Sequence, residues 1–240
     1  MLAFALPATY FVVKINVDAD LMLAKLSPYY DKIYEPAEDS FLLLDLFEEI
    51  GATVANNKPR LVVELGTGSG IVSTFLNQHI LKNAFLIATD INPHCCHAAI
   101  ATNAKNAATV NFDSIQGDLT SSLRPASVDL LIFNPPYVPS PFVPTVPESA
   151  EDQTWLDLAL DGGNDGMAVT NRLLQSLGKI LAPKGQAYIL FCARNNPSMV
   201  AEQFLKDHPS FRVEKMIERK AGWEVLSVYL FQNTASQKDR

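Results

Sequence analysis

Residues 60–70 read Arg60-Leu-Val-Val-Glu-Leu-Gly-Thr-Gly-Ser-Gly70, an apolar run that leads directly into a glycine-rich turn. A short apolar run is typical of a strand buried on both faces, and the pattern after Gly70 predicts a helix over about 71–80. Glycines at such a turn let the backbone approach a ligand closely, and the helix N-terminus offers unpaired N–H groups. The stretch therefore predicts a strand, a turn and a helix with a ligand site at the turn.

The same alternation of short β-branched runs and helical patterns continues toward the C-terminus, which is typical of βαβ units. We expect further strands over 84–89, 110–115, 128–133 and 185–192, and helices beginning at Pro93, over 167–181 and over 197–207. Pro183-Lys-Gly185 predicts a turn before the fifth strand. Residues 211–218 and 224–231 predict an antiparallel hairpin. The fold class is α/β, a doubly wound, mostly parallel seven-stranded sheet with a C-terminal antiparallel hairpin.

The N-terminal part predicts one more helix and little else. Asp39 or Ser40 is expected to cap a helix whose apolar face is formed by Phe41, Leu44 and Leu46 or Phe47. The apolar opening lacks a positive region and is shorter than the roughly 20 residues that cross a bilayer, so no membrane contact is expected. We expect a poorly defined head over 1–30, one domain over 31–232 and a flexible tail over 233–240.

Composition narrows the function. Of 240 residues, 48% are hydrophobic and 19% charged, which indicates a globular protein. The net charge of −7 argues against a broad phosphate-binding surface, so nucleic acid is not the expected partner. Three cysteines cannot form a disulfide framework and indicate a reducing compartment. We expect a cytoplasmic protein, with the nucleus as a second location.

Acids follow the next two predicted strands. Asp90 ends the second strand, where a carboxylate in a doubly wound sheet can accept hydrogen bonds from ribose hydroxyls. Asp90 alone could equally be a helix N-cap. Gly117-Asp118-Leu119 follows the third strand and could match the donor and acceptor edge of adenine, or be a simple turn. Beside the glycine turn, these acids predict a nucleoside-containing ligand.

The most informative motif is Asn134-Pro-Pro-Tyr137 at the end of the fourth strand. Strands one and four flank the crevice of such sheets, so Asn134 should face the ligand. The prolines lack N–H donors and leave two acceptors, the Asn134 side-chain oxygen and the Pro135 carbonyl. Such acceptors suit the binding of an NH₂ group.

The four motifs together resemble the class I S-adenosylmethionine-dependent methyltransferases. The Tyr34-Glu-Pro-Ala-Glu-Asp-Ser40 head, the Leu158-Ala-Leu-Asp-Gly-Gly-Asn-Asp-Gly166 segment and the Asn-Pro-Pro-Tyr motif narrow the resemblance. They resemble the eukaryotic and archaeal branch of the HemK family of protein glutamine N5-methyltransferases. The resemblance implies methylation of the glutamine in the Gly-Gly-Gln loop of a class 1 peptide-chain release factor, by direct transfer.

The resemblance also implies roles for individual residues. Glu64, Gly66 and Gly68 would line the methionine and ribose end of S-adenosyl-L-methionine, with Ser40 reaching the methionine. Asp90 would bind the ribose, and Asp118 and Leu119 the adenine. Asn134 would contact both cofactor and substrate, and Pro135, Pro136 and Tyr137 would complete the substrate and catalytic site.

Other functions remain open at this stage. The glycine pattern G-x-G-x-G only partly meets the dinucleotide fingerprint, so a nicotinamide enzyme is the weaker interpretation. Adenine-N6 methylation of DNA or RNA and lysine methylation use a similar pocket, and a binding-only protein would predict a damaged motif, which is not seen. The segment 138–171 contains no Lys or Arg and carries six acids: Glu148, Glu151, Asp152, Asp157, Asp161 and Asp165. This acidic segment would repel a phosphate backbone. It could receive a basic protein loop, or it could be an ordinary solvated loop.

Partner and metal expectations come last. The resemblance implies a small zinc-binding activator subunit that pairs with an open edge at Val110 to Ile115, near Val128 and Leu130. The sequence alone favours an edge protected by the chain's own loops. The run His94-Cys-Cys-His97 lacks the spacing of a closed zinc site, so no metal is expected. Trp155 and Trp223 are expected to be packing residues and Cys192 a buried small hydrophobe.

Overall fold

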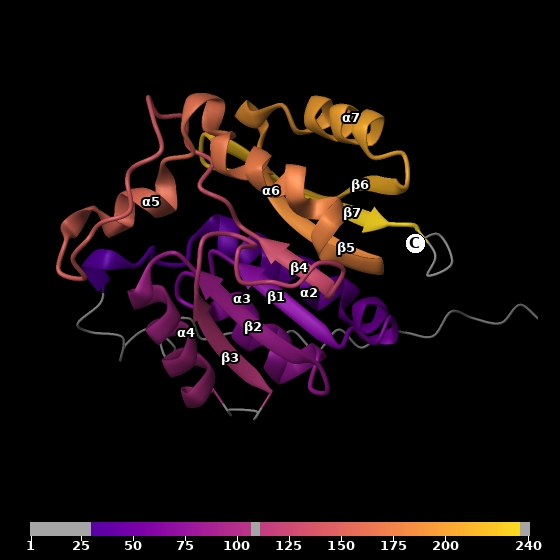
Figure 1. Ribbon diagram of the computed structural model, residues 1–240, viewed down its shortest axis with the longest axis horizontal. Coiled ribbons are helices and arrows are strands. Elements are labelled where there is room, and N and C mark those ends of the chain that lie inside the picture. The colour runs from indigo at the N-terminus through magenta and orange to yellow at the C-terminus, as the bar shows by residue number, and fades with distance from the viewer. Residues whose placement is uncertain (1–29, 107–110, 236–240) are drawn as a thin grey trace, which may run out of the picture.

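A computed structural model describes residues 30–106 and 111–235. Within them, the strands form one seven-stranded sheet with helices on both faces (Figure 1). The strands are β1 (Leu61–Leu65), β2 (Phe85–Asp90), β3 (Phe112–Gln116), β4 (Val128–Phe133), β5 (Leu181–Cys192), β6 (Phe211–Ala221) and β7 (Glu224–Asn233).

Helical segments alternate with these strands. The α-helices are α2 (Glu38–Asn56), α3 (Ile71–Phe75), α4 (Pro93–Lys105), α5 (Asp157–Leu160), α6 (Ala168–Ile180) and α7 (Pro197–Asp207). Short turns of 3₁₀ or π type are η1 (Tyr30–Lys32), η2 (Leu76–Ile80), η3 (Gln153–Leu156), η4 (Asn164–Gly166) and η5 (Ala193–Asn195).

The strand order is β3-β2-β1-β4-β5-β7-β6, and β7 is antiparallel to both β5 and β6. The predicted doubly wound sheet with a C-terminal antiparallel hairpin is therefore confirmed. The direction of winding reverses between β1 and β4, which are hydrogen-bonded neighbours. Open sheets of this kind bind ligands at the carboxyl ends of the strands beside that reversal.

Two apolar layers hold the helices on the sheet. One layer joins α2 and α3 to the sheet and includes Phe47 and Leu130. The other joins α6 and α7 to the opposite face and includes Leu173 and Phe204. Leu131 and Leu130 are both almost fully buried, although they point to opposite faces, because β4 is covered on both sides. The central strands therefore form a fixed platform for the loops at their carboxyl ends.

The N-terminal end of α2 differs from the prediction. Ala37 is the N-cap and makes no side-chain capping bond; Asp39 and Ser40 lie inside the first turn, where Asp39 Oδ1 accepts from the Ser40 N–H. The two polar side chains face the interior instead, with exposures of 4% and 8%. The buried face also includes Leu42 and Leu43, because α2 packs against both the sheet and α3.

Two local irregularities were not expected. The helix predicted over 71–80 is α-helical only to Phe75 and continues as a π-turn, closed by the Leu81 N–H bonding to the Leu76 carbonyl at 2.7 Å. The predicted turn at Pro183-Lys-Gly185 lies inside β5, which begins at Leu181. The register with β4 shifts there, so the prolyl turn forms a bulge rather than a strand boundary.

The two tryptophans, Cys192 and the edge strand differ in how well they match the predictions. Trp223 is 97% exposed at the tip of the β6–β7 hairpin, so the packing prediction was wrong for it; the turn at Gly222, with φ of 59°, projects the indole into solvent. Trp155 and Cys192 are buried as predicted. β3 is the edge strand as expected, but Val128 and Leu130 belong to central β4 and are buried.

The ends of the predicted domain fall near the limits of the described chain. The head over 1–29 and residues 236–240 of the predicted tail lie outside the described residues, as does Val110 of the third predicted strand. β7 extends through Asn233, one residue past the predicted domain end, and Thr234 donates a hydrogen bond to the Ser210 carbonyl. No described helix is long and apolar enough to span a membrane.

Candidate active site

A cavity of about 1090 Å³, counting part of its open mouth, lies at the carboxyl ends of β1, β2 and β4. A pocket of this size holds a cofactor-sized molecule. It is lined by all eight residues predicted for the cofactor: Ser40, Glu64, Gly66, Gly68, Asp90, Asp118, Leu119 and Asn134. These residues come from five separate segments, so the topology brings the predicted site together.

Asp90 connects the end of β2 to the glycine turn. Its Oδ2 accepts a hydrogen bond from the Gly68 N–H at 3.0 Å, and its Oδ1 accepts one from the Asn92 N–H at 2.9 Å. Burial raises the pKa of Asp90, while these N–H donors oppose that shift. The alternative N-cap role falls to Asn92, whose side chain accepts from His94 N. Asp90 is thus a pocket carboxylate rather than a helix cap.

Glu64 is a carboxyl group buried in β1. Its Oε2 accepts hydrogen bonds from Thr67 Oγ1 at 2.8 Å and from Ser73 N at 3.1 Å, and also from the Ser73 hydroxyl. Burial raises its pKa to about 7 despite these bonds. All three of these donors bind Oε2, so Oε1 is left to accept a hydrogen bond from a ligand in the cavity that Glu64 lines.

The adenine end of the predicted site is less buried. Asp118 Oδ2 pairs with Arg172 at 2.6 Å, and both side chains are about half exposed. Exposed ion pairs contribute little stability, so a ligand can replace this one at low cost. Leu119 has φ of 49°, a left-handed conformation that costs a non-glycine residue about 1–3 kcal/mol. Strained backbone beside a cavity is a common feature of binding sites.

Asn134 presents its carboxamide to the same cavity. Its Nδ2 donates to Asp39 Oδ2 at 3.1 Å. Its Oδ1 is buried and has no hydrogen-bond partner among the described residues. An unsatisfied buried acceptor costs about 1–3 kcal/mol, so this oxygen is a strong candidate for contact with a bound NH₂ group.

The rest of the Asn-Pro-Pro-Tyr motif is arranged around this carboxamide. Pro136 lines the cavity, whereas Pro135 and Tyr137 are not part of its lining. The Tyr137 hydroxyl donates to Glu224 at 3.3 Å, so the C-terminal hairpin contacts the motif. Burial, followed by the charges of Asp39 and Glu224, raises the pKa of Tyr137, which keeps the hydroxyl protonated.

The segment 158–166 supports the motif from behind. Val138 pairs with Asp161, and Gly162 N–H donates to the Val138 carbonyl at 2.9 Å. Buried Asn195 donates to the carbonyls of Tyr137 and Asp165. The glycine-rich segment therefore fixes the backbone of the motif, which explains why the two stretches occur together in one sequence.

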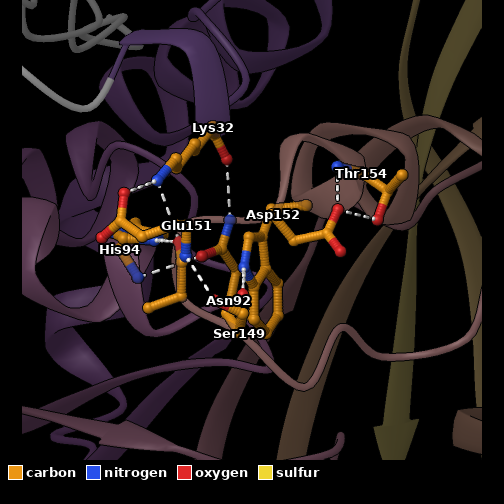
Figure 2. A network of polar contacts seen from close by, with 9 residues as sticks. Lys32, Asn92, His94, Ser149, Glu151, Asp152 and Thr154 are labelled. Carbon is orange, nitrogen blue, oxygen red and sulfur yellow. Dashed lines mark hydrogen bonds and ion pairs between the residues drawn. The ribbon is translucent and has the colours of Figure 1, made fainter.

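A network of polar contacts joins Lys32 of η1, the start of α4 and the acidic segment, as Figure 2 shows. Lys32 Nζ donates to the Ala150 carbonyl at 2.9 Å and to Glu151 at 3.0 Å. His94 Nε2 lies 2.7 Å from the same carbonyl, and Asn92 Nδ2 donates to the Lys32 carbonyl. We call residues 149–155, with these contacts, the strap.

The His94-Cys-Cys-His97 run has structural contacts instead of a shared centre. His94 binds the strap, and Cys96 Sγ approaches the Asp90 carbonyl at 3.7 Å. Burial raises the pKa of Cys95, so its thiol is protonated at neutral pH. Within residues 30–106 and 111–235, no group of three or more His, Cys, Asp or Glu side chains is placed to hold a metal.

Several site residues were missed by the sequence arguments. Lys32, Trp155 and Arg172 line the cavity, and Asp39 binds Asn134. Asp39 had a visible signal, since it lies in the Glu-Pro-Ala-Glu-Asp-Ser motif, but the motif predicted only a helix cap for it. Lys32 and Arg172 lie far along the chain from the residues they contact, so no local pattern could have paired them.

Comparisons with known proteins give the family. The methyltransferase small domain model matches residues 40–141. The eRF1 methyltransferase catalytic subunit mtq2 of Schizosaccharomyces pombe is 38% identical over 210 residues, covering 83% of this chain and 88% of that one. Human methyltransferase HEMK2 is 34% identical, covering 84% and 90%. The chain belongs to the eukaryotic and archaeal branch of the HemK methyltransferase family.

A solved structure supports the fold of this HemK-family enzyme. The structure of the Encephalitozoon cuniculi Mtq2–Trm112 complex, described as methylating the translation termination factor eRF1, matches with a TM-score of 0.61 at 23% identity. The match covers 84% of this chain and 99% of that one. The predicted family and fold are confirmed, and the enzyme is a methyltransferase whose cofactor is S-adenosylmethionine.

The residues of the pocket fit that cofactor. Carboxyl groups at Glu64 and Asp90 offer acceptors for ribose hydroxyls and for an ammonium group. Apolar side chains such as Leu119, Leu158 and Val169 line the remaining wall and suit a flat base. The roles of individual residues remain predictions that the geometry supports.

Proposed function

We propose that this enzyme transfers a methyl group from S-adenosylmethionine to the side-chain nitrogen of a glutamine, in the Gly-Gly-Gln loop of a class 1 peptide-chain release factor. The observation that carries the proposal is Asn134, which lines the cofactor pocket and whose buried side-chain oxygen lacks a protein partner among the described residues. A glutamine NH₂ supplies the donor that this oxygen requires.

The chemistry depends on orientation more than on activation. S-Adenosylmethionine supplies an electrophilic methyl group on a positive sulfur. The amide nitrogen is a weak nucleophile, because its lone pair is delocalised into the carbonyl. Asn134 Oδ1 would bind one amide hydrogen and aim the lone pair at the methyl group. The Pro135 carbonyl would bind the second hydrogen if the substrate reaches past the cavity lining formed by Asn134 and Pro136. These acceptors would also stabilise positive charge as it develops on nitrogen, and a proton would then leave to water.

Named relatives support the choice of substrate. The Schizosaccharomyces pombe relative is an eRF1 methyltransferase subunit by name, and it matches over most of both chains. A Methanocaldococcus jannaschii relative, whose name is that of a protein N5-glutamine methyltransferase, is 31% identical. The match covers 85% of this chain and 92% of that one. A shared substrate is the simplest explanation of a match over nearly the full length.

A nucleic-acid substrate is the rival proposal, and the surroundings of the pocket weigh against it. The acidic segment contacts the pocket through the strap, and Glu148, Glu151, Asp157 and Asp165 are exposed there. Lys32 neutralises part of this charge through its pair with Glu151. A phosphate backbone would still meet net negative charge at the entrance, whereas a basic protein loop would be attracted.

The deciding experiment compares substrates in one assay. Purified enzyme with labelled S-adenosylmethionine is expected to label an intact release factor but not its Gly-Gly-Gln to Gly-Gly-Ala variant, and not DNA or RNA oligomers. Asn134→Ala should lower turnover about 100-fold or more while calorimetry shows cofactor affinity near that of the wild type. Label on oligomers with none on the release factor would overturn the proposal.

We also propose a small activator subunit that pairs with the edge strand β3. In the described part of the chain β3 pairs only with β2, which leaves one side of its backbone open to strand addition. The solved Encephalitozoon cuniculi relative is a complex with Trm112, a second protein. A zinc-binding character of the subunit follows from the resemblance alone. If the enzyme purifies alone as a fully active, soluble monomer, this partner is not required.

A further inference from the structure

Asp39 makes a contact with Asn134 that fixes how the carboxamide is turned. An asparagine side chain can be rotated by 180° to exchange its oxygen and nitrogen at almost no steric cost. Asp39 Oδ2 lies 3.1 Å from Nδ2 of Asn134. A carboxylate can only accept, so it binds the NH₂ end and leaves the oxygen turned away from Asp39, buried and without a hydrogen-bond partner among the described residues.

The structure holds Asp39 itself from the other side. Its Oδ1 accepts from the Ser40 backbone N–H at 2.6 Å and from the Ser40 hydroxyl at 3.3 Å. The side chain is 4% exposed and lies in the first turn of α2, where the helix dipole favours a negative charge. Burial, followed by the charge of Asp39 and a hydrogen bond to it, raises the pKa of Tyr34, so Tyr34 remains a donor to Asp39.

We propose that Asp39 is a positioning residue for methyl transfer, which holds the Asn134 carboxamide with its oxygen toward the substrate nitrogen. This inference rests on the proposed function, because it assigns the free oxygen of Asn134 to a substrate NH₂ group. Asp39 itself contacts neither the reacting nitrogen nor the methyl group; it acts through Asn134.

The substitution Asp39→Asn gives a specific expectation. The Ser40 N–H still needs an acceptor, so the oxygen of the new amide should stay on that side. Its NH₂ group would then face Asn134, which must turn its own oxygen toward position 39. The NH₂ group of Asn134 would point into the pocket and oppose the substrate NH₂ group.

The kinetic result expected for Asp39→Asn is a fall in kcat of about 100-fold, comparable to the loss of one preorganised catalytic hydrogen bond. The KM for the release factor and the Kd for the cofactor should change by no more than about threefold, because the fold and the pocket shape are retained. Glu38→Gln is the matched control, since Glu38 is the exposed neighbouring carboxylate in the same helical turn. It should leave kcat unchanged.

The double variant Asp39→Asn with Asn134→Asp exchanges the two groups. The amide at position 39 can donate to a carboxylate at position 134, whose second oxygen again accepts from the substrate. Asn134→Asp alone would place two carboxylates side by side, which repel each other. We expect the double variant to recover at least about tenfold in kcat over Asp39→Asn, a rescue that a purely structural role of Asp39 would not give.

A measurement without substrate separates this inference from the proposed function. In ¹H–¹⁵N spectra, the side-chain NH₂ signals of Asn134, identified by their loss in Asn134→Asp, should shift and exchange faster with water in Asp39→Asn but not in Glu38→Gln. Unchanged Asn134 signals in Asp39→Asn would overturn the positioning role, as would an equal loss of cofactor affinity and kcat. A wild-type enzyme that does not label the release factor even when its activator subunit is present would overturn the proposed function alone, because the spectra still report the orientation.

Discussion

At the scale of single residues, Glu64 links stability to pH. Its pKa rises from 4.5 to about 7 on folding, so the folded state holds the proton more tightly. Between pH 4.5 and about pH 7 the unfolded chain binds fewer protons at this group than the folded protein does. The free energy of unfolding therefore falls as the pH rises through this window, by about 3 kcal/mol in total. Glu64→Gln should remove this fall. Urea unfolding of both proteins at pH 5 and pH 8 measures it, and an identical pH dependence would contradict the assignment.

Two glycines of the first turn give a matched pair of substitutions. Gly68 and Gly70 both have positive φ, 54° and 77°, so alanine costs about 1 kcal/mol or more of backbone strain at either position. A Cβ at Gly68 meets nothing within 4 Å among the described residues and would enter the cavity, whereas a Cβ at Gly70 would lie 2.5 Å from Ala99 Cα. Gly70→Ala must therefore push α4 away from α3.

The expected results differ in kind. Gly68→Ala should lower cofactor affinity about tenfold or more and cost only about 1 kcal/mol of stability. Gly70→Ala should cost about 3 kcal/mol or more, because the clash is with backbone. Calorimetry with the cofactor and thermal unfolding measure the two effects. A Gly68→Ala enzyme that binds cofactor like the wild type would show that the ligand does not approach this turn.

At the scale of elements, the sequence predicted most helices and strands to within a few residues, because their apolar periodicity is strong. β4 and α7 match their predicted bounds. The π-turn after Phe75 and the bulge inside β5 were missed, since both arise from pairing with distant segments rather than from local propensity. The predicted N-cap of α2 was wrong for a related reason. Asp39 lies inside the first turn, and its Oδ2 accepts from Asn134, a residue far away in the sequence.

The strap is the element whose role is easiest to test. Lys32 joins the strap to η1 through the Ala150 carbonyl and Glu151. The Lys32 side chain is 11% exposed, against 89% for Glu151. Lys32→Met should speed cofactor dissociation about threefold to tenfold with little change in stability, because it removes the hydrogen bond from a largely buried lysine side chain to the Ala150 carbonyl. Glu151→Gln, which loses only an exposed ion pair, should have almost no effect. Stopped-flow measurement of cofactor release distinguishes them; equal effects would mean that the ion pair, not the backbone bond, holds the strap.

At the scale of the whole molecule, topology explains why separate motifs predicted one site. The turns after β1, β2 and β4 lie together at the carboxyl ends of these strands. Glu64, Asp90 and Asn134 therefore line one cavity although they are far apart in sequence. Residues of the motifs were therefore predictable, whereas their hydrogen-bond partners were not. Asn195, which fixes the Tyr137 carbonyl, follows β5 without any motif of its own.

The charge of the whole molecule gives the last prediction. The enzyme has a net charge of −7, and the exposed acids of the segment 148–165 lie beside the cavity mouth. Glu148→Lys with Asp157→Lys should lower kcat/KM for the release factor about tenfold at low salt, because a basic loop would lose attraction during encounter.

Glu49→Lys with Glu202→Lys, which makes the same change of net charge on exposed positions of α2 and α7, is the matched control and should have a much smaller effect. In about 1 M salt, where the Debye length is about 3 Å, the two variants should converge on the wild type. An increase in kcat/KM for the first variant would instead indicate an acidic substrate, as expected for a nucleic acid.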